Sequence, residues 1–282
     1  MKVTIIGVGL IGGSMALKLK KSGFATYVHG VDRSERHLEE AKKLNIIDES
    51  VNLEEGVKNA DLIIISVPVD AAKDLIIQVL NLVEAHQTVM DVGSTKADIV
   101  QAVRNHPKRS RFVAFHPMWG TENSGPAAAQ AESFTGRVAV ICNAGESAED
   151  ALKLVEIVAH QLVMPVVQMD AADHDVHTAY ISHISHITSY ALANTVLEKE
   201  REEDKIFQLA SSGFSSTVRL AKSHPDMWVP IFRQNRENVL DVLNEHISQL
   251  RKFKAALEKE NYDLLQELIV NANRIRGILD HS

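Results

Sequence analysis

Cysteine is almost absent from the 282-residue sequence, in which Cys142 is the one thiol. A single cysteine cannot form a disulfide within the chain, and this fits a reducing compartment such as the cytoplasm. No apolar run reaches the roughly 18 residues that a membrane-spanning helix requires. The apolar N-terminus is short and continues into glycines, unlike a secretory signal peptide. We therefore expect a cytoplasmic protein without a membrane partner.

An excess of positive charge is also missing. The chain has 30 Lys and Arg against 37 Asp and Glu, a formal net charge of −7 at pH 7. The acidic surplus is spread over both halves, so neither a basic patch nor an acidic tail stands out. This argues against nucleic acid as a partner. With 45% hydrophobic residues the chain can bury a core, and its length suits about two domains.

Short apolar runs alternate with helical segments up to residue 168. Most runs are continuously apolar, as in parallel strands that are buried on both faces. We expect strands at Lys2–Gly7, Tyr27–Val31, Leu62–Val67, Thr88–Val92, Arg111–Phe115, Arg137–Cys142 and Met164–Gln168. We expect helices at Leu10–Ser22, Ser34–Leu44, Asp70–Leu82, Thr95–Arg104 and Ser147–Gln161. This order predicts an α/β fold with a Rossmann-type, mostly parallel sheet.

The pattern after Met169 contains no further convincing strand. Asp170–Glu200 predicts one long helix. An apolar stripe at helical spacing follows, made of Val239, Leu243, Ile247, Leu250 and Leu257. No Pro/Gly-rich linker separates the two patterns. We therefore expect two packed domains, residues 1–168 and an all-helical domain at residues 169–282.

A glycine-rich turn follows the first strand, a helix follows the turn, and an acidic residue comes twenty positions after Gly12. In dinucleotide-binding folds such glycines permit the tight turn, the approach of a pyrophosphate and close helix packing. Asp32 can accept hydrogen bonds from ribose hydroxyls, which favours NAD over NADP, although Arg33 could accommodate a 2′-phosphate. A turn needed for packing alone is the alternative. The candidate cofactor residues here are Gly7, Gly9, Leu10, Ile11, Gly12, Asp32 and Arg33.

Two more strands end in polar or proline-containing segments. Ligands bind at the carboxyl ends of strands in open α/β sheets. We therefore expect Ser66, Val67 and Pro68 to face the nicotinamide, together with Ser94 in the segment after the fourth strand. Ser94 and Thr95 could instead serve only to cap a helix.

His116 follows the fifth strand, at the same predicted edge of the sheet. An imidazole titrates near neutral pH and can accept a proton from a substrate hydroxyl. His183 and His186, three residues apart, share one face of the predicted long helix. Their spacing is too loose a signal for zinc, so we predict no metal. His174 and His177 are interpreted as solvated helix residues.

Arg219 follows a Ser/Thr-rich segment, Ser211–Val218. A guanidinium there suits a fixed, bidentate clamp on a carboxylate, although an isolated surface arginine is the alternative.

Six segments occur in one order along the whole chain: GxGLIGGS, DVGSTK, HPMWGTE, ISHISH, SSGF…R and NRENVL. This combination resembles the prephenate/arogenate dehydrogenase family of tyrosine biosynthesis. The resemblance implies NAD(P)-dependent oxidative decarboxylation of a cyclohexadienyl substrate. It also implies a C-terminal helical domain that forms a homodimer.

The resemblance assigns roles to matching residues. His116 matches the catalytic histidine that binds the ring hydroxyl, and Ser94 matches the serine that assists it. Arg219 matches the arginine that holds a substrate carboxylate, and His186 a second substrate contact. Trp228 falls where the family can reach into the neighbouring subunit's pocket. Further pocket positions are Ser182, His183, Thr121 and Glu122.

Two departures from the family pattern bear on the substrate. Ile184 and Ser185 stand where Leu-Pro is expected, a change that a helix tolerates. Ser215 and Ser216 follow SGF where some arogenate-preferring members carry Arg-Asp, which favours prephenate. With no mutase segment before the glycine turn and little chain after the last helix, we expect the stand-alone form.

The resulting prediction is NAD-dependent conversion of prephenate to 4-hydroxyphenylpyruvate. The same chemistry on arogenate, forming tyrosine directly, remains open. A β-hydroxyacid-type dehydrogenase would need a helical catalytic lysine, and none stands near His183 and His186. A non-catalytic NAD-binding module is the alternative from another class.

Overall fold

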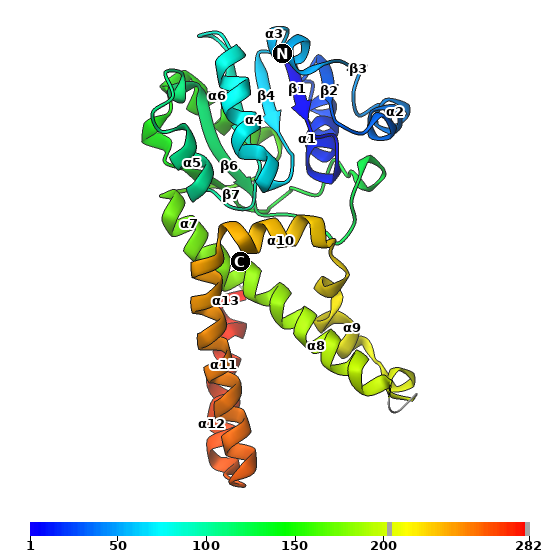
Figure 1. Cartoon of the computed structure of the whole chain (residues 1–282), viewed down its shortest axis with the longest axis vertical. Coiled ribbons are helices and arrows are strands. Elements are labelled where there is room, and N and C mark those ends of the chain that lie inside the picture. The colour runs from blue at the N-terminus through cyan, green and yellow to red at the C-terminus, as the bar shows by residue number, and fades with distance from the viewer. Residues whose placement is uncertain (202–204, 280–282) are drawn as a thin grey trace. The chain divides into compact units, whose positions relative to one another are not determined.

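An eight-stranded sheet forms the N-terminal part of the computed structural model, which describes residues 1–201 and 205–279 (Figure 1). The strand order is β3-β2-β1-β4-β5-β6-β7-β8, and every neighbouring pair is parallel except the antiparallel β6 and β7. The predicted mostly parallel sheet is confirmed. Its strands are β1 (Lys2–Ile6), β2 (Tyr27–Val31), β3 (Glu49–Ser50), β4 (Leu62–Ile65), β5 (Thr88–Asp91), β6 (Phe112–Pro117), β7 (Ala139–Cys142) and β8 (Val166–Met169).

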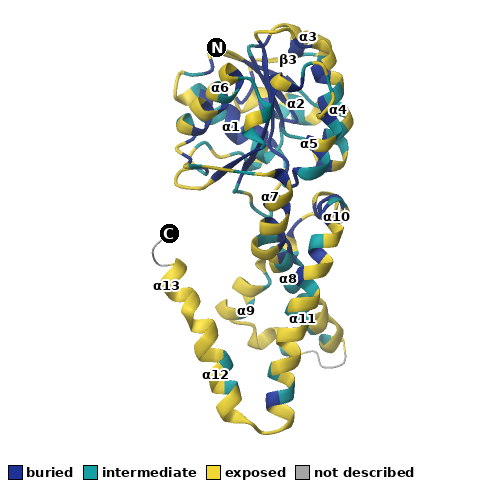
Figure 2. Cartoon of the chain, turned by 90° about the vertical axis from the view of Figure 1, so that its left-hand side faces the viewer, coloured by how far each residue is buried: buried dark blue, intermediate teal, exposed yellow. Residues whose placement is uncertain are grey.

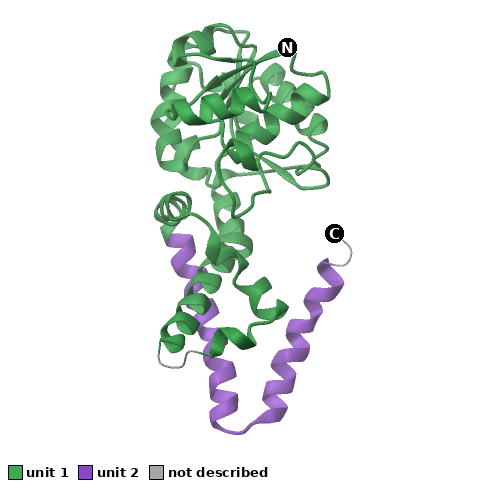
Figure 3. Ribbon diagram, turned by 90° about the vertical axis from the view of Figure 1, so that its right-hand side faces the viewer, with its two compact units in different colours: residues 1–236 green, residues 237–282 purple. Residues whose placement is uncertain are grey.

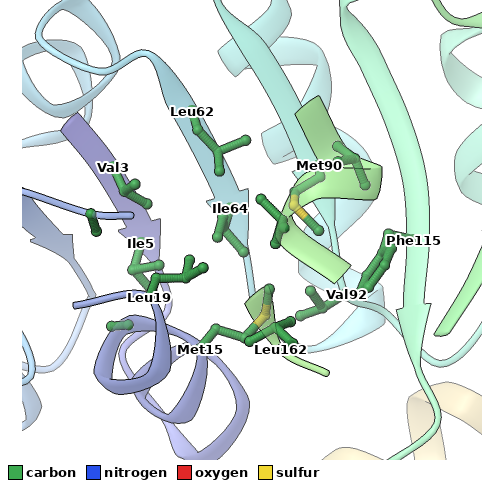
Figure 4. Packing of buried hydrophobic residues seen from close by; sticks show 14 of the residues in the cluster. Val3, Ile5, Met15, Leu19, Leu62, Ile64, Met90, Val92, Phe115 and Leu162 are labelled. Atoms are coloured by element: carbon green, nitrogen blue, oxygen red, sulfur yellow. The ribbon is translucent and has the colours of Figure 1, made fainter. Parts of the chain in front are cut away.

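Helices cover both faces of this sheet, and a separate apolar core lies on each face. Successive residues of a strand point to opposite faces, so Leu62 and Ile64 of β4 enter one core while Ile63 and Ile65 enter the other. Figure 4 shows the first core, where Leu62 lies beside Val3 and Ile64 lies beside Ile5. The helices are α1 (Leu10–Lys21) and α6 (Glu149–Gln161) on that face, and α3 (Leu53–Lys58), α4 (Val69–Leu82) and α5 (Ala97–Val103) on the other, with α2 (Glu35–Lys43) after β2.

The structure corrects several predicted bounds. β7 begins at Ala139, and α5 begins at Ala97. β6 continues through Pro117, so His116 lies inside the strand and does not follow it. β3 and α3 were not predicted. β3 consists of two exposed polar residues, which carry no apolar pattern.

The described part of the chain beyond β8 consists of helices and the turns between them, without a further strand, as predicted. The expected long helix is present as α7 (Ala171–Thr178) and α8 (Ile184–Glu200), but a π-helical turn, Ala179–His183, separates them. The following helices are α9 (Ser212–Thr217), α10 (Pro225–Gln234), α11 (Arg236–Glu258), α12 (Tyr262–Ala272) and α13 (Arg276–Leu279). Within residues 1–201 and 205–279, none of the helices combines the length and the apolar content needed to cross a membrane.

By compactness the chain divides after Arg236 (Figure 3). Residues 1–236 form one unit, which contains the sheet and the helices up to α10. Residues 237–282 form the second unit, a helical hairpin in its described part. The helices that carry the predicted pocket residues therefore belong to the same unit as the sheet.

Candidate active site

The glycine turn between β1 and α1 has the geometry that a bound dinucleotide needs. Gly7 has φ +95°, and a Cβ on it would lie 2.2 Å from the carbonyl oxygen of Ser66. A Cβ on Gly12 would lie 2.2 Å from the carbonyl oxygen of Gly7, whereas one on Gly9 would meet nothing within 4 Å. Gly7 and Gly12 thus permit close packing, and Gly9 leaves open space beside the start of α1.

The start of α1 remains available to an anion. No side chain caps it and its first turn contains no acidic residue, so backbone N–H groups and the helix dipole favour a phosphate there. Leu10 and Ile11 form this turn and are half-buried. Ser66 and Val67 follow β4 beside Gly7, with Pro68 exposed at the start of α4.

Asp32 joins the end of β2 to the glycine turn. Its Oδ2 accepts the Val8 N–H at 3.0 Å, and its Oδ1 accepts the Ser34 N–H at 2.8 Å. The carboxylate is thereby fixed at the carboxyl edge of the sheet, where a ribose hydroxyl could bind it. Arg33, next to it, is exposed.

A chain of hydrogen bonds leads from His116 into α7. His116 Nδ1 lies 2.8 Å from His174 Nε2, and His174 Nδ1 lies 2.8 Å from Asp175 Oδ1. The side chains of His174 and Asp175 are buried, so the interpretation of His174 as a solvated residue is wrong. The ring partner of His116 is therefore His174; Ser94 lies half-buried in the bend between β5 and α5.

Asp175 also holds the start of α5. Its Oδ1 accepts the Lys96 N–H at 2.8 Å, and its Oδ2 accepts the Ala97 N–H at 2.9 Å. This carboxylate, from another helix, provides the cap that Ser94 or Thr95 could have supplied. The Thr95 hydroxyl instead donates to Gln234 Oε1 at 2.6 Å.

The electrostatics keep His116 neutral. Burial lowers the pKa of His116 well below its usual range, and His174, Lys96 and His183 lower it further. The Lys96 ammonium forms a buried ion pair with Asp91. A neutral imidazole at the carboxyl edge of the sheet can accept a hydrogen bond or a proton.

The π-helical turn and α8 bring the other two predicted histidines next to Trp228. The His186 and Trp228 rings stack with centroids 3.4 Å apart, and His183 meets Trp228 edge-on at 5.9 Å. His183 Nδ1 lies 3.2 Å from Asn235 Nδ2, while His186 Nδ1 lies 3.1 Å from the carbonyl oxygen of Ser182. Burial lowers the pKa of His183 to about 4 and also lowers the pKa of His186.

Trp228 lies at the centre of this aromatic cluster. It is 5% exposed and packs against the rings of His186 and Phe232. Its indole Nε1–H meets no acceptor among the described residues.

Arg219 and Glu122, both predicted pocket residues, form an ion pair of 3.2 Å between Nη1 and Oε2. A backbone hydrogen bond and the Arg219 guanidinium lower the pKa of Glu122. Arg219 also acts electrostatically on His186. The Thr121 hydroxyl accepts the Asn123 N–H at 3.2 Å within the same loop.

Within the described residues, no group of three or more His, Cys, Asp or Glu is arranged to hold a metal ion. Cys142 is buried in β7, and burial raises the pKa of its thiol to about 12, which makes the thiolate inaccessible near neutral pH.

The residues that sequence reasoning missed are His174, Asp175, Lys96 and Asn235. Lys96 belongs to DVGSTK and Asn235 to NRENVL, so both lay in segments already singled out. His174 and Asp175 carry the signal of adjacent ionisable residues near the start of a helix, a pattern that solvated helices share.

Together the glycine turn, the sheet topology and the histidine cluster define a Rossmann-type nucleotide-binding protein with an acid–base site at the carboxyl edge of its sheet. Comparison with known families specifies it further. The family described as "Prephenate dehydrogenase, nucleotide-binding domain" matches residues 15–166, and "Prephenate dehydrogenase, dimerization domain" matches residues 170–271. The chain belongs to the prephenate dehydrogenase family, which confirms the resemblance seen in its motifs.

Individual relatives agree with this assignment. Prephenate dehydrogenase of Bacillus subtilis is 32% identical over 94% of this chain and 73% of its own length. Cyclohexadienyl dehydrogenase of Zymomonas mobilis is 28% identical over 99% of this chain and 97% of its own length. Prephenate dehydrogenase from A. aeolicus, crystallised with hydroxyphenyl propionate and NAD+, superposes with a TM-score of 0.90 at 30% identity over 99% and 98%. The structure of Synechocystis arogenate dehydrogenase superposes with a TM-score of 0.78 at 25% identity, over 99% of this chain and 100% of its own.

Proposed function

We propose that this chain is an NAD-dependent prephenate dehydrogenase, which converts prephenate to 4-hydroxyphenylpyruvate by oxidative decarboxylation. The observation that carries the proposal is the neutral, buried His116 at the carboxyl edge of the sheet, on the same edge as the open glycine turn. The family and the A. aeolicus complex with NAD+ support the cofactor and the substrate class.

The residues at the sheet edge fit NAD. Gly9 leaves room where a Cβ would meet nothing within 4 Å, and the first turn of α1 offers uncapped N–H groups to a pyrophosphate. The half-buried Asp32 carboxylate suits a ribose diol and disfavours a 2′-phosphate, whereas Arg33 points to NADP only weakly because it is exposed. NAD, when bound, accepts the hydride from the hydroxyl-bearing ring carbon.

The protein orients the substrate and stabilises its developing charge. Positive charge grows on the ring hydroxyl as hydride departs, and His116 accepts the hydroxyl hydrogen bond through Nε2. Loss of carbon dioxide from the opposite ring carbon then returns two electrons to the ring, which becomes aromatic. Arg219 holds a substrate carboxylate, His186 is a further substrate contact, and Ser94 assists His116.

The remaining pocket positions, Ser182, His183, Thr121, Glu122 and Trp228, are proposed to shape the substrate site from the same unit. We propose residues 1–168 as the nucleotide-binding domain and 169–282 as the substrate-binding and dimerisation domain of a cytoplasmic homodimer. Exposed apolar side chains on the described helices after Arg236 support the dimer; they include Leu250, Leu257, Ile269, Val270, Ile278 and Leu279.

Arogenate is the second candidate substrate, because the Synechocystis relative is named arogenate dehydrogenase and the Zymomonas relative cyclohexadienyl dehydrogenase. The test follows reduction of NAD with prephenate and with arogenate in parallel. Faster turnover of prephenate supports the proposal, and faster turnover of arogenate reverses the choice. Activity with neither substrate would favour a non-catalytic NAD-binding module.

The role of His116 has its own test. His116→Asn should lower kcat with prephenate by roughly 10²–10⁴-fold, because the hydroxyl loses its acceptor. Affinity for NAD, measured by calorimetry, should remain that of the parent. Near-normal turnover of His116→Asn would remove His116 from the mechanism.

A further inference from the structure

We propose that His174 and Asp175 are positioning residues that hold His116 as the Nδ1–H tautomer, with the Nε2 lone pair directed to the substrate hydroxyl. The proposal rests on the proposed function for the identity of that hydroxyl. The tautomer itself follows from the hydrogen-bonding groups of this chain.

Asp175 sets the direction of the hydrogen bonds. Its two oxygens already accept the backbone N–H groups of Lys96 and Ala97 at 2.8 and 2.9 Å. An ionised carboxylate only accepts hydrogen bonds, so His174 Nδ1, 2.8 Å from Oδ1, is the donor.

The tautomer of His174 in turn determines the tautomer of His116. A neutral imidazole that donates through Nδ1 has only a lone pair at Nε2. His174 Nε2 lies 2.8 Å from His116 Nδ1, so His116 must donate there and carries its own lone pair on Nε2. The Asp175 carboxylate, 59 residues further along the chain, thereby selects the atom of His116 that meets substrate.

The charges around the cluster favour a neutral His116. His116 is faced by His174 of α7, by Lys96 before α5 and by His183 of the π-helical turn, and Lys96 is paired with Asp91 of β5. Lys96 already places one positive charge in this buried region. A second one on His116 would add repulsion and desolvation.

His183 provides an internal contrast. Asn235 Nδ2 donates to the carbonyl oxygen of Asp175 at 2.6 Å, so this atom is the amide nitrogen and not the oxygen. The same Nδ2 lies 3.2 Å from His183 Nδ1, which must accept. His183 therefore carries its proton on Nε2, the opposite of His116.

During turnover the arrangement also stabilises charge. Positive charge that reaches His116 can be shared through its Nδ1–H with His174 and with the Asp175 carboxylate beyond it. This is the logic by which an aspartate orients the histidine of a serine-protease triad, with one more imidazole in the series.

The direct test needs no substrate. Protein labelled with ¹⁵N in its histidines is measured by long-range ¹H–¹⁵N correlation near pH 8, which distinguishes Nδ1–H from Nε2–H rings. We expect Nδ1–H for His116 and His174 and Nε2–H for His183. Signals are assigned by their loss in His116→Asn, His174→Gln and His183→Gln. An Nε2–H tautomer at His116 overturns the proposal.

The kinetic test uses two substitutions at one position. His174→Phe fills the space but leaves no acceptor for His116 Nδ1–H, and kcat with prephenate should fall roughly 10²-fold with little change in the KM for NAD. His174→Gln retains an amide oxygen as acceptor and should recover most of kcat. Equal kcat values for the two variants would count against a tautomer-setting role.

Thr178→Val is the matched control. Thr178 is buried on α7 one turn after His174, and its hydroxyl donates only to backbone carbonyl oxygens of that helix. Thr178→Val should retain the parent kcat. A loss as large as that of His174→Phe would show that disturbance of α7 alone explains the effect. If the parent oxidises neither prephenate nor arogenate, the proposed function fails, whereas the tautomer pattern is still decided by the spectra.

Discussion

The sheet with its covering helices and the described part of residues 237–282 differ in how far they bury their apolar side chains (Figure 2). In residues 1–236 the strands and their covering helices bury two cores completely, and side chains such as Ile64 and Phe112 have no exposed surface. In the described part of residues 237–282, the buried apolar residues are Val239, Val242 and Ala256, while larger side chains stay exposed. The sheet and its helices thus bury their apolar faces within one chain, whereas the described helices after Arg236 leave many of theirs exposed.

A substitution in the sheet should have the largest effect on stability. Ile64 lies in the middle of β4 with 0% exposure, so Ile64→Ala should lower the free energy of unfolding by about 2–5 kcal/mol. Denaturant unfolding at several protein concentrations measures this. The matched Ile269→Ala removes a 47%-exposed side chain from α12, and its effect should be small at concentrations where the chains are monomeric. If Ile64→Ala and Ile269→Ala lowered the free energy of unfolding equally at low concentration, the proposed difference in burial between the sheet and α12 would be wrong.

Acid should weaken the first unit through His183. Its pKa is about 4 in the folded chain, against about 6.5 in an unfolded one. Above pH 6.5 both states are neutral; below it the unfolded chain binds the proton first, so stability falls as pH drops toward 4. This contribution amounts to at most about 3 kcal/mol over the window. His183→Gln should show a correspondingly flatter pH dependence of unfolding, and an unchanged slope would contradict the assignment.

A change in the hairpin should instead affect assembly. Leu257 and Ile269 are 57% and 47% exposed, and the double variant Leu257→Asp/Ile269→Asp places charges on this surface. We expect the dimer Kd to rise at least tenfold, about 1.4 kcal/mol, measured by light scattering over a dilution series. Binding of NAD should persist because the glycine turn lies in the other unit. A dimer of parental affinity would show that this surface is not the interface.

The smallest effect is expected from an exposed ion pair of the hairpin. Lys254 Nζ lies 3.4 Å from Glu258 Oε1, one turn further along α11, and both side chains are largely exposed. Glu258→Gln should change the free energy of unfolding by no more than about 0.5 kcal/mol and leave the dimer intact. It therefore serves as the control for the aspartate variants, and a large effect would reveal an additional partner for Glu258.

Local patterns predicted much of the first unit. The glycine turn and the start of α1 are encoded by consecutive residues, and continuous apolar runs identified the strands that are buried on both faces. The site at His116 was predictable because its strand and its motif adjoin each other in sequence.

What the sequence pattern could not provide is the set of contacts made across the fold. The His116–His174 hydrogen bond joins positions 58 residues apart, so it requires the placement of α7 against the end of β6. Asp175 caps α5 from a distance of 78 residues, a role that no local capping pattern signals. β3 escaped prediction because its pairing with β2 depends on backbone groups rather than on apolar side chains.

The π-helical turn Ala179–His183 has a consequence for insertions and deletions. Each residue of an α-helix advances the face by about 100°, so the wider turn changes the phase of everything after it. α7, before the turn, places His174 against His116 at the sheet edge. α8, after the turn, places His186 against Trp228. Deleting one residue there would break no strand and shorten no loop, yet it would swing His186 around the helix axis. The number of residues in this one turn therefore fixes the orientation of His186 relative to His174.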